Sequence, residues 1–159
     1  MEKYEFKKIY GDNAKRLFNF ILWTTGNRAV CEDILQNVFI KVWRSATVPA
    51  DANGRIAWLY AITRNACIDY FRGLKRFSQY NDDAGVAVEK SDNEDDGRLA
   101  WNKVAQLPET DRAIIYLHLK IGYSYGEIGR FFDMTENHVR VRTFRALRKL
   151  RGILTRKGL

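Results

Sequence analysis

Six arginine and lysine side chains crowd into the segment 135–151, TENHVRVRTFRALRKLR, at positions 140, 142, 145, 148, 149 and 151. An arginine can donate two parallel hydrogen bonds to O6 and N7 of guanine, and either type of cation can bind a phosphate. In the same segment Val139, Thr143, Ala146 and Leu150 recur at the spacing of one helical face. The segment therefore predicts a helix that packs along one stripe and offers its other faces to a nucleic acid.

The residues before this helix predict how it is positioned. Ser124 stands three residues before Glu127, which is the spacing of a capping box at the start of a helix. The helix that it opens, YGEIGRFFD, is short, Met134 forms a turn, and Thr135 caps the basic helix. A short helix, a tight turn and a longer basic helix have the spacing of a helix-turn-helix.

The first turns of a recognition helix lie in the major groove of DNA. We therefore expect Arg140, Arg142 and Arg145 to reach base edges, and Phe144 to make an apolar contact such as one with a thymine methyl. The cations from position 148 onward are expected to bind phosphates, which position a protein without reading sequence. The alternative is a solvated basic face on which Phe144 covers a neighbouring side chain.

Charge divides the 159 residues into three parts. Residues 1–77 carry 13 basic and 7 acidic side chains, residues 78–97 carry 1 and 7, and residues 98–159 carry 13 and 5. The acidic part has few large apolar residues and cannot bury enough surface to offset the entropy of ordering, although it could equally serve solubility alone. The prediction is an all-α protein with two small helical domains, 1–77 and 98–159, joined by a flexible acidic linker, 78–97.

Helical spacing and turn residues subdivide both domains. In the first, Gly26 is expected to end one helix and Asn27 to cap the next, over 28–45, before a turn-rich loop over 49–54. A third helix is expected over 56–72. In the second domain, helices are expected over 99–107 and 109–120, ended by Pro108 and Gly122.

Several classes of protein are disfavoured. The two cysteines and two histidines stand singly, without the spacing of a zinc site, and Glu32 and Asp33 are adjacent, so a helix does not aim both at one metal. The expectation is a protein that is not an enzyme and needs no cofactor or metal. Without a long apolar run or a signal peptide, we expect no membrane insertion and a cytoplasmic location. The net charge of +8 favours a polyanionic partner.

Motifs in both halves, in order, resemble the extracytoplasmic-function (ECF) group of bacterial sigma-70 type sigma factors. The first half carries AVCEDILQNVFIKVWR and AWLYAITRNACIDYFR, and the second carries LPETDRAIIYL, GYSYGEIGRFF and HVRVRTFRALRKLR. The resemblance implies a sigma region 2-like helical bundle and a region 4-like helix-turn-helix. It also implies a factor that binds core RNA polymerase, at the β′ coiled coil and the β flap, and directs promoter recognition and transcription initiation. A further implied partner is an anti-sigma factor.

The resemblance also implies roles for individual residues. Those matching the stretch that docks on the β′ coiled coil are Asp33, Gln36, Asn37, Phe39 and Trp43. Those expected at the −10 element, where a base is flipped out, are Asn53, Arg55, Trp58, Tyr60, Arg64 and Asn65. Those expected at the −35 element are Thr135, His138, Arg140, Arg142, Phe144, Arg145, Arg148 and Lys149. Asn37 replaces an acidic residue of the family, and Gly126 and Gly129 are expected to loosen the supporting helix.

Other interpretations remain open at this point. Trp58 could be a core residue, and Asn65 could be an ordinary polar surface residue. The main rival function is a stand-alone helix-turn-helix transcriptional regulator that does not join polymerase. A small nucleic-acid enzyme and an inactive paralogue that titrates an anti-sigma factor are the other two.

Overall fold

The computed structural model describes residues 1–80 and 102–157, with side chains through residue 79 and over 102–152. In these two ranges every regular element is a helix, which confirms the predicted all-α class. The chain divides into two compact units, Met1–Glu89 and Lys90–Leu159. Most of the predicted linker, residues 81–97, lies outside the described residues, whereas 78–80 belong to the last helix of the first unit.

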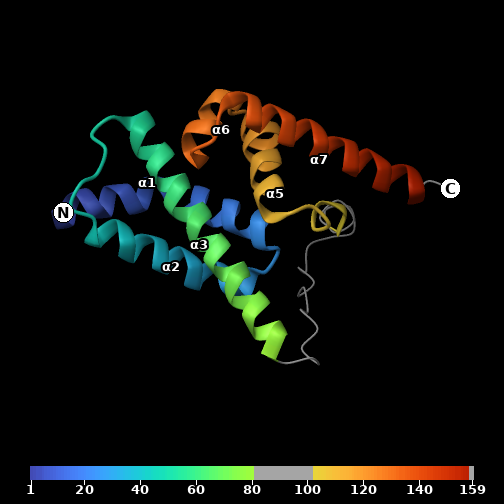
Figure 1. The fold of residues 1–159 in the computed structure, drawn as a ribbon. Helices are drawn as coiled ribbons and strands as arrows, with labels where there is room; N and C mark the ends of the chain where they lie inside the picture. The colour runs from blue at the N-terminus through green and yellow to red at the C-terminus, as the bar shows by residue number, and fades with distance from the viewer. Residues whose placement is uncertain (81–101, 158–159) are drawn as a thin grey trace. The chain divides into compact units, whose positions relative to one another are not determined.

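Three helices build the first unit: α1 (Lys3–Thr25), α2 (Arg28–Arg44) and α3 (Ala52–Tyr80) (Figure 1). Each helix packs on the other two. The centre of the core contains the fully buried Leu17, Phe20, Val38 and Leu59. Gly11 does not interrupt α1, where it lies on the exposed side.

The connection between α1 and α2 follows the sequence prediction. Gly26 adopts a left-handed conformation with φ 66° and donates its N–H to Leu22 O, a conformation that glycine adopts without the cost of a Cβ. The Asn27 side chain then accepts a 3.0 Å hydrogen bond from Ala29 N. Two residues are enough for this turn, because Gly26 satisfies a backbone carbonyl at the end of α1 and Asn27 satisfies a backbone N–H at the start of α2.

The third helix starts earlier than predicted. Residues 52–54 were expected in a loop, but α3 begins at Ala52 because Asp51 caps it: a carboxylate oxygen of Asp51 accepts from Gly54 N at 2.7 Å. Arg55 fixes the preceding loop by donating from Nε to Pro49 O at 3.2 Å. The helix also continues past position 72, to Tyr80.

The second unit contains α5 (Glu109–Ile115), a π-helical segment η1 (Tyr116–Ile121), α6 (Tyr125–Phe132) and α7 (Glu136–Lys157). The single helix predicted over 109–120 is thus an α-helix for its first half and a π-helix for its second. Gly122, with φ 96°, ends it and donates its N–H to Leu117 O. Of the helix predicted over 99–107, residues 102–104 are helical and 99–101 lie outside the described residues.

Candidate nucleic-acid and protein interfaces

Both helices of the predicted helix-turn-helix, α6 and α7, begin with the expected caps. Ser124 Oγ accepts from Glu127 N at 3.1 Å, and the Glu127 carboxylate accepts from Ser124 N at 2.8 Å, which completes the capping box. Asp133 takes the left-handed conformation, with φ 54°, at the end of α6. Thr135 Oγ1 then accepts from His138 N at 3.1 Å and so caps α7. The side chain of Thr135 is therefore engaged in starting the helix.

Gly129 has a different role from the one expected. A Cβ at this position would lie 2.5 Å from the carbonyl oxygen of Met134, far inside van der Waals contact. Gly129 therefore permits the close approach of α6 to the turn, where the Met134 N–H bonds to Gly129 O at 2.8 Å. The expectation that this glycine loosens the helix is wrong, because a backbone group occupies the place of its side chain.

The predicted stripe attaches α7 to the rest of the unit. Val139, Thr143 and Ala146 are buried, and Thr143 satisfies its hydroxyl by donating to Val139 O at 2.8 Å. Leu150 is partly buried against a cluster formed by Leu107, Ile115 and Ala146. The buried face of α7 is thus the one that the sequence spacing predicted.

The opposite side of α7 is exposed. Phe144 keeps 71% of its surface accessible, which leaves it outside the core and free to contact a partner. Arg145, Arg148 and Lys149 are exposed around it. This mixture of one large apolar side chain and several cations matches what major-groove recognition requires.

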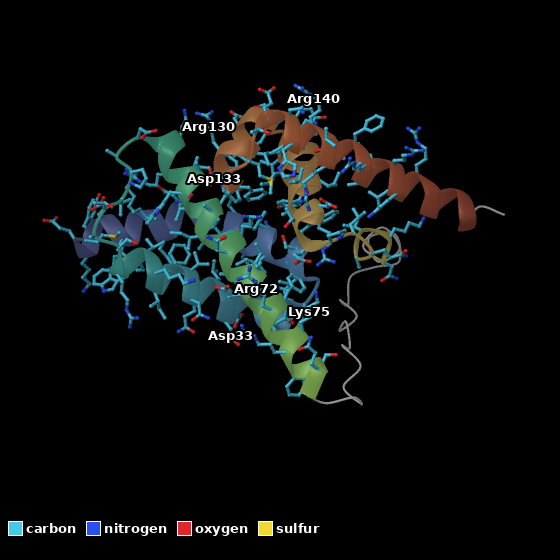
Figure 2. The ribbon with its side chains drawn as sticks, viewed as in Figure 1. Asp33, Arg72, Lys75, Arg130, Asp133 and Arg140 are labelled. Atoms are coloured by element: carbon cyan, nitrogen blue, oxygen red, sulfur yellow. The ribbon has the colours of Figure 1, made fainter. Side chains whose placement is uncertain are left out.

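Two of the expected DNA-reading arginines have partners within the unit. Arg140, near the start of α7 (Figure 2), bonds to Glu136 at 3.1 Å on the surface, with its guanidinium 5.6 Å from the centre of the Tyr125 ring. Arg142 instead points to α5, where its Nε donates to Asp111 Oδ1 at 2.8 Å. The remaining expected residue of this helix, His138, is exposed.

The residues expected at the −10 element occupy different environments on α3 and its start. Asn53 and Asn65 are exposed, and Trp58 and Arg64 are half-buried. Tyr60 is completely buried, with its ring centroid 5.3 Å from that of Phe20. In this structure Tyr60 cannot stack on a base, which corrects that expectation: its position in the helix turns it toward α1.

The surface expected to dock on polymerase adjoins a groove of about 1360 Å³ between α1 and α2. Four aromatic side chains form a contiguous cluster in it. The ring centroids of Phe6 and Trp43 are 5.0 Å apart, and those of Tyr10 and Phe39 are 4.6 Å apart. Phe39 is buried and forms the floor, whereas Trp43 keeps 46% of its surface exposed.

Charged and polar groups edge this groove. Lys3, Lys7 and Arg44 line it together with one acid, Glu32, so its margin is net basic. Gln36 also lines it, and Asp33 and Asn37 are exposed on the same helix. Phe6 and Tyr10 complete the site, and the sequence analysis did not single them out. Their position four residues apart on α1, matching Phe39 and Trp43 on α2, is the sequence signal that could have identified them.

The two cysteines lie in the interior of the first unit. Cys31 and Cys67 are buried free thiols, and burial raises the pKa of Cys31. Nowhere in residues 1–80 and 102–152 do three His, Cys, Asp or Glu side chains gather in a way that could hold a metal. A search of the described helices also found none with the length and apolar character needed to cross a membrane.

Comparisons with known proteins match both units. The family described as "Sigma-70 region 2" matches residues 9–77, and "Sigma-70, region 4" matches residues 104–152. The chain is 29% identical to ECF RNA polymerase sigma factor SigL of Mycobacterium tuberculosis, over 96% of this chain and 90% of that protein. It is also 29% identical to RNA polymerase sigma factor CarQ of Myxococcus xanthus, over 94% and 88%.

A solved structure shares the fold. The sigma factor RpoE, crystallised with the anti-sigma factor NepR from Bartonella quintana, superposes with a TM-score of 0.77 at 22% identity, covering 95% of this chain and 97% of that one. At this identity the likeness concerns the fold, and the family assignment depends on the sequence matches to both halves.

Proposed function

Because this chain belongs to the ECF group of sigma-70 type RNA polymerase sigma factors, we propose that its two units divide the work of initiation. The first unit, which contains α1, α2 and α3, binds core polymerase and the −10 element. The second, from about residue 98 onward, binds the −35 element. The protein regulates initiation and performs no catalytic step of its own, and it acts in the cytoplasm, where polymerase and promoter meet.

The exposed face of α7 recognises the −35 element. The exposure of its cations and Phe144, on the side that the buried stripe leaves free, is the observation that most supports this function. Phe144, Arg145 and Arg148 project from the side of the helix that the buried stripe leaves free. A bidentate arginine–guanine contact contributes about 1–3 kcal/mol of discrimination against a wrong base. Arg148 and Lys149 lie further along and supply phosphate contacts, which add affinity on any sequence.

Recognition of the −10 element falls to α3 and the loop before it. Asn65 is exposed and carries both a donor and an acceptor, which suits the edge of an extruded base. Half-buried Trp58 and Arg64 offer faces on which bases can stack. Arg55 serves this site indirectly, because its bond to Pro49 O shapes the loop.

Polymerase binding is assigned to α2 and the groove beside it. Trp43 offers a large, partly exposed ring that packs on Phe6, and Phe6 in turn packs on the buried Phe39. Aromatic side chains in well-packed surroundings dominate binding at protein interfaces. The basic margin of Lys3, Lys7 and Arg44 suits a helical partner with acidic residues.

An anti-sigma factor is a second proposed partner. The RpoE structure contains one bound to a protein of the same fold. An inhibitor that covers either the groove or the exposed face of α7 would block initiation, so the proposal requires only that it compete with polymerase or promoter.

The test is run-off transcription by core polymerase on a genomic library, with and without the purified protein. We expect a defined set of new start sites that share two upstream elements. Trp43→Ala should lose co-migration with core polymerase, whereas Phe144→Ala should keep it and lose start-site selection. A protein that binds specific DNA by itself but neither joins polymerase nor changes its start sites would be the stand-alone regulator instead.

A further inference from the structure

The ion pair between Asp111 and Arg142 differs from the other contacts of α7's cations. It joins residues 31 positions apart, on α5 and α7, with Nε and Oδ1 separated by 2.8 Å. The side chains are only 29% (Arg142) and 13% (Asp111) exposed. Partial burial strengthens such a charge-assisted hydrogen bond and reduces its screening by salt. The pair therefore connects the recognition helix firmly to a second element.

The residue beside Asp111 extends this connection. Arg112 is buried, and its Nη1 donates to Ala105 O at 3.0 Å and to Leu107 O at 3.2 Å. The start of α5 thus holds the segment before it through Arg112 and holds α7 through Asp111. One helical turn of α5 fixes both neighbours with charged groups, in addition to the apolar cluster of Leu107, Ile115 and Ala146.

The pair formed by Arg140 and Glu136 is a natural control. It is also an arginine–carboxylate pair on α7, but both residues belong to the same helix, and their side chains are 53% and 61% exposed. Such a pair cannot fix α7 relative to another element. Releasing it should change local charge without changing how the helix is oriented.

We propose that Arg142 is a positioning and specificity-determining residue, which fixes the rotation of α7 through Asp111 instead of reading a base itself. The inference rests on the proposed function, since it concerns recognition of the −35 element. Phe144 and Arg145 are exposed on α7, and a small rotation of α7 would move both off their base edges. The ion pair adds a directional restraint to that of the buried stripe, because its hydrogen bond weakens steeply when Nε and Oδ1 move apart.

Direct reading and positioning predict opposite effects of one substitution. If Arg142 contacts DNA, Asp111→Asn releases it and removes a negative charge, so binding is stronger or unchanged. If Arg142 positions the helix, Asp111→Asn loses discrimination between matched and mismatched −35 elements by about fivefold or more, the value of one displaced base contact. Arg142→Gln should give the same loss, and the two losses should not add.

The experiment measures competition between promoters with matched and singly substituted −35 elements for holoenzyme containing the full chain. A change in charge that alters the affinity for both promoters equally leaves the ratio of the two affinities unchanged. Glu136→Gln alters the charge beside Arg140 without removing a contact between helices, so it should not reproduce the loss expected for Asp111→Asn. The charge-swapped double variant, Asp111→Arg with Arg142→Asp, should restore much of the ratio, because it rebuilds the ion pair. It leaves an acid at position 142, so the recovery could not come from a base contact by that residue.

Each outcome decides the proposal. Loss in both single variants with recovery in the swap supports it, provided that circular dichroism and polymerase binding are retained. Loss with Arg142→Gln but not with Asp111→Asn, or a folded swap without recovery, overturns it. If the single variants unfold, the swap decides alone. Wild-type holoenzyme that does not distinguish the promoters would refute the proposed function, and this inference with it.

Discussion

Gly129 and Gly126 should respond oppositely to the same added methyl group. In Gly129→Ala the new Cβ would lie 2.5 Å from Met134 O and 3.6 Å from Glu136 N, both backbone atoms of the turn. In Gly126→Ala the nearest atom is a carboxylate oxygen of Glu136 at 3.6 Å, which is an ordinary contact with a flexible side chain. The two positions belong to the same helix, α6, so each is a control for the other.

The magnitudes follow from packing and helix propensity. Overpacking against atoms that cannot move freely costs about 1–3 kcal/mol, while replacing a helical glycine with alanine stabilises by up to about 1 kcal/mol. Gly129→Ala should therefore destabilise the α6–α7 turn by about 1–2 kcal/mol. Gly126→Ala should be neutral or stabilising by a few tenths to about 1 kcal/mol.

Native-state hydrogen exchange of the full chain, read by mass spectrometry, would measure this difference locally. Peptides covering α6 and the start of α7 should exchange about 5–30-fold faster in Gly129→Ala than in the wild type. Peptides from α2 should not change in either variant. Exchange in Gly129→Ala as slow as in Gly126→Ala would refute the argument that backbone proximity at the turn requires glycine.

Three further predictions concern the surfaces and the buried thiol. Arg145→Ala should cost about 1–3 kcal/mol of DNA-binding free energy and relax the preference at one base pair. Arg148→Ala should instead weaken binding on all sequences and lower the dependence of binding on salt, as a log–log slope, by about one. A reversed pattern in promoter binding across a salt series would mean that α7 is rotated on the DNA. Asn65→Ala should reduce promoter melting in permanganate footprints more than it reduces −35 binding, and equal melting would exclude its proposed role. Cys31 should react slowly with a thiol reagent at pH 8 until urea unfolds the chain, because burial raises its pKa and its thiol donates to Asn27 O; equal rates with and without urea would contradict this.

The features that the sequence predicted correctly are local ones. The helix ends at Gly26 and Asn27, the capping box at Ser124 and the cap at Thr135 each depend on residues within three or four positions. The stripe on α7 depends only on helical periodicity. Such interactions form in almost any context, so residue types at fixed spacing predict them reliably.

What the sequence did not reveal is mostly how residues pack against atoms of another segment. Tyr60 was expected to face a base, but the packing of α3 on α1 places it against Phe20. For Gly129 the sequence predicts the turn at Met134, but not that the carbonyl oxygen of Met134 occupies the place of a Cβ at position 129. The pairing of Arg142 with Asp111 spans 31 positions. No local pattern reveals the contacts of Tyr60 and Arg142, since the deciding atoms come from another helix.

For α7, however, the spacing of the residues also predicts how far each cation lies from the buried stripe. At about 100° per residue, Arg142 lies only about 70° from the centre of the buried stripe, whereas Phe144 and Arg145 lie about 130° and Arg148 about 170° from it. A long side chain about 70° from a packed face can reach around to the neighbouring helix, and Arg142 does so at Asp111. Arg148 cannot, because the helix itself intervenes. Angular distance from the stripe therefore distinguishes Arg142, which pairs with α5, from Arg145 and Arg148, which stay exposed.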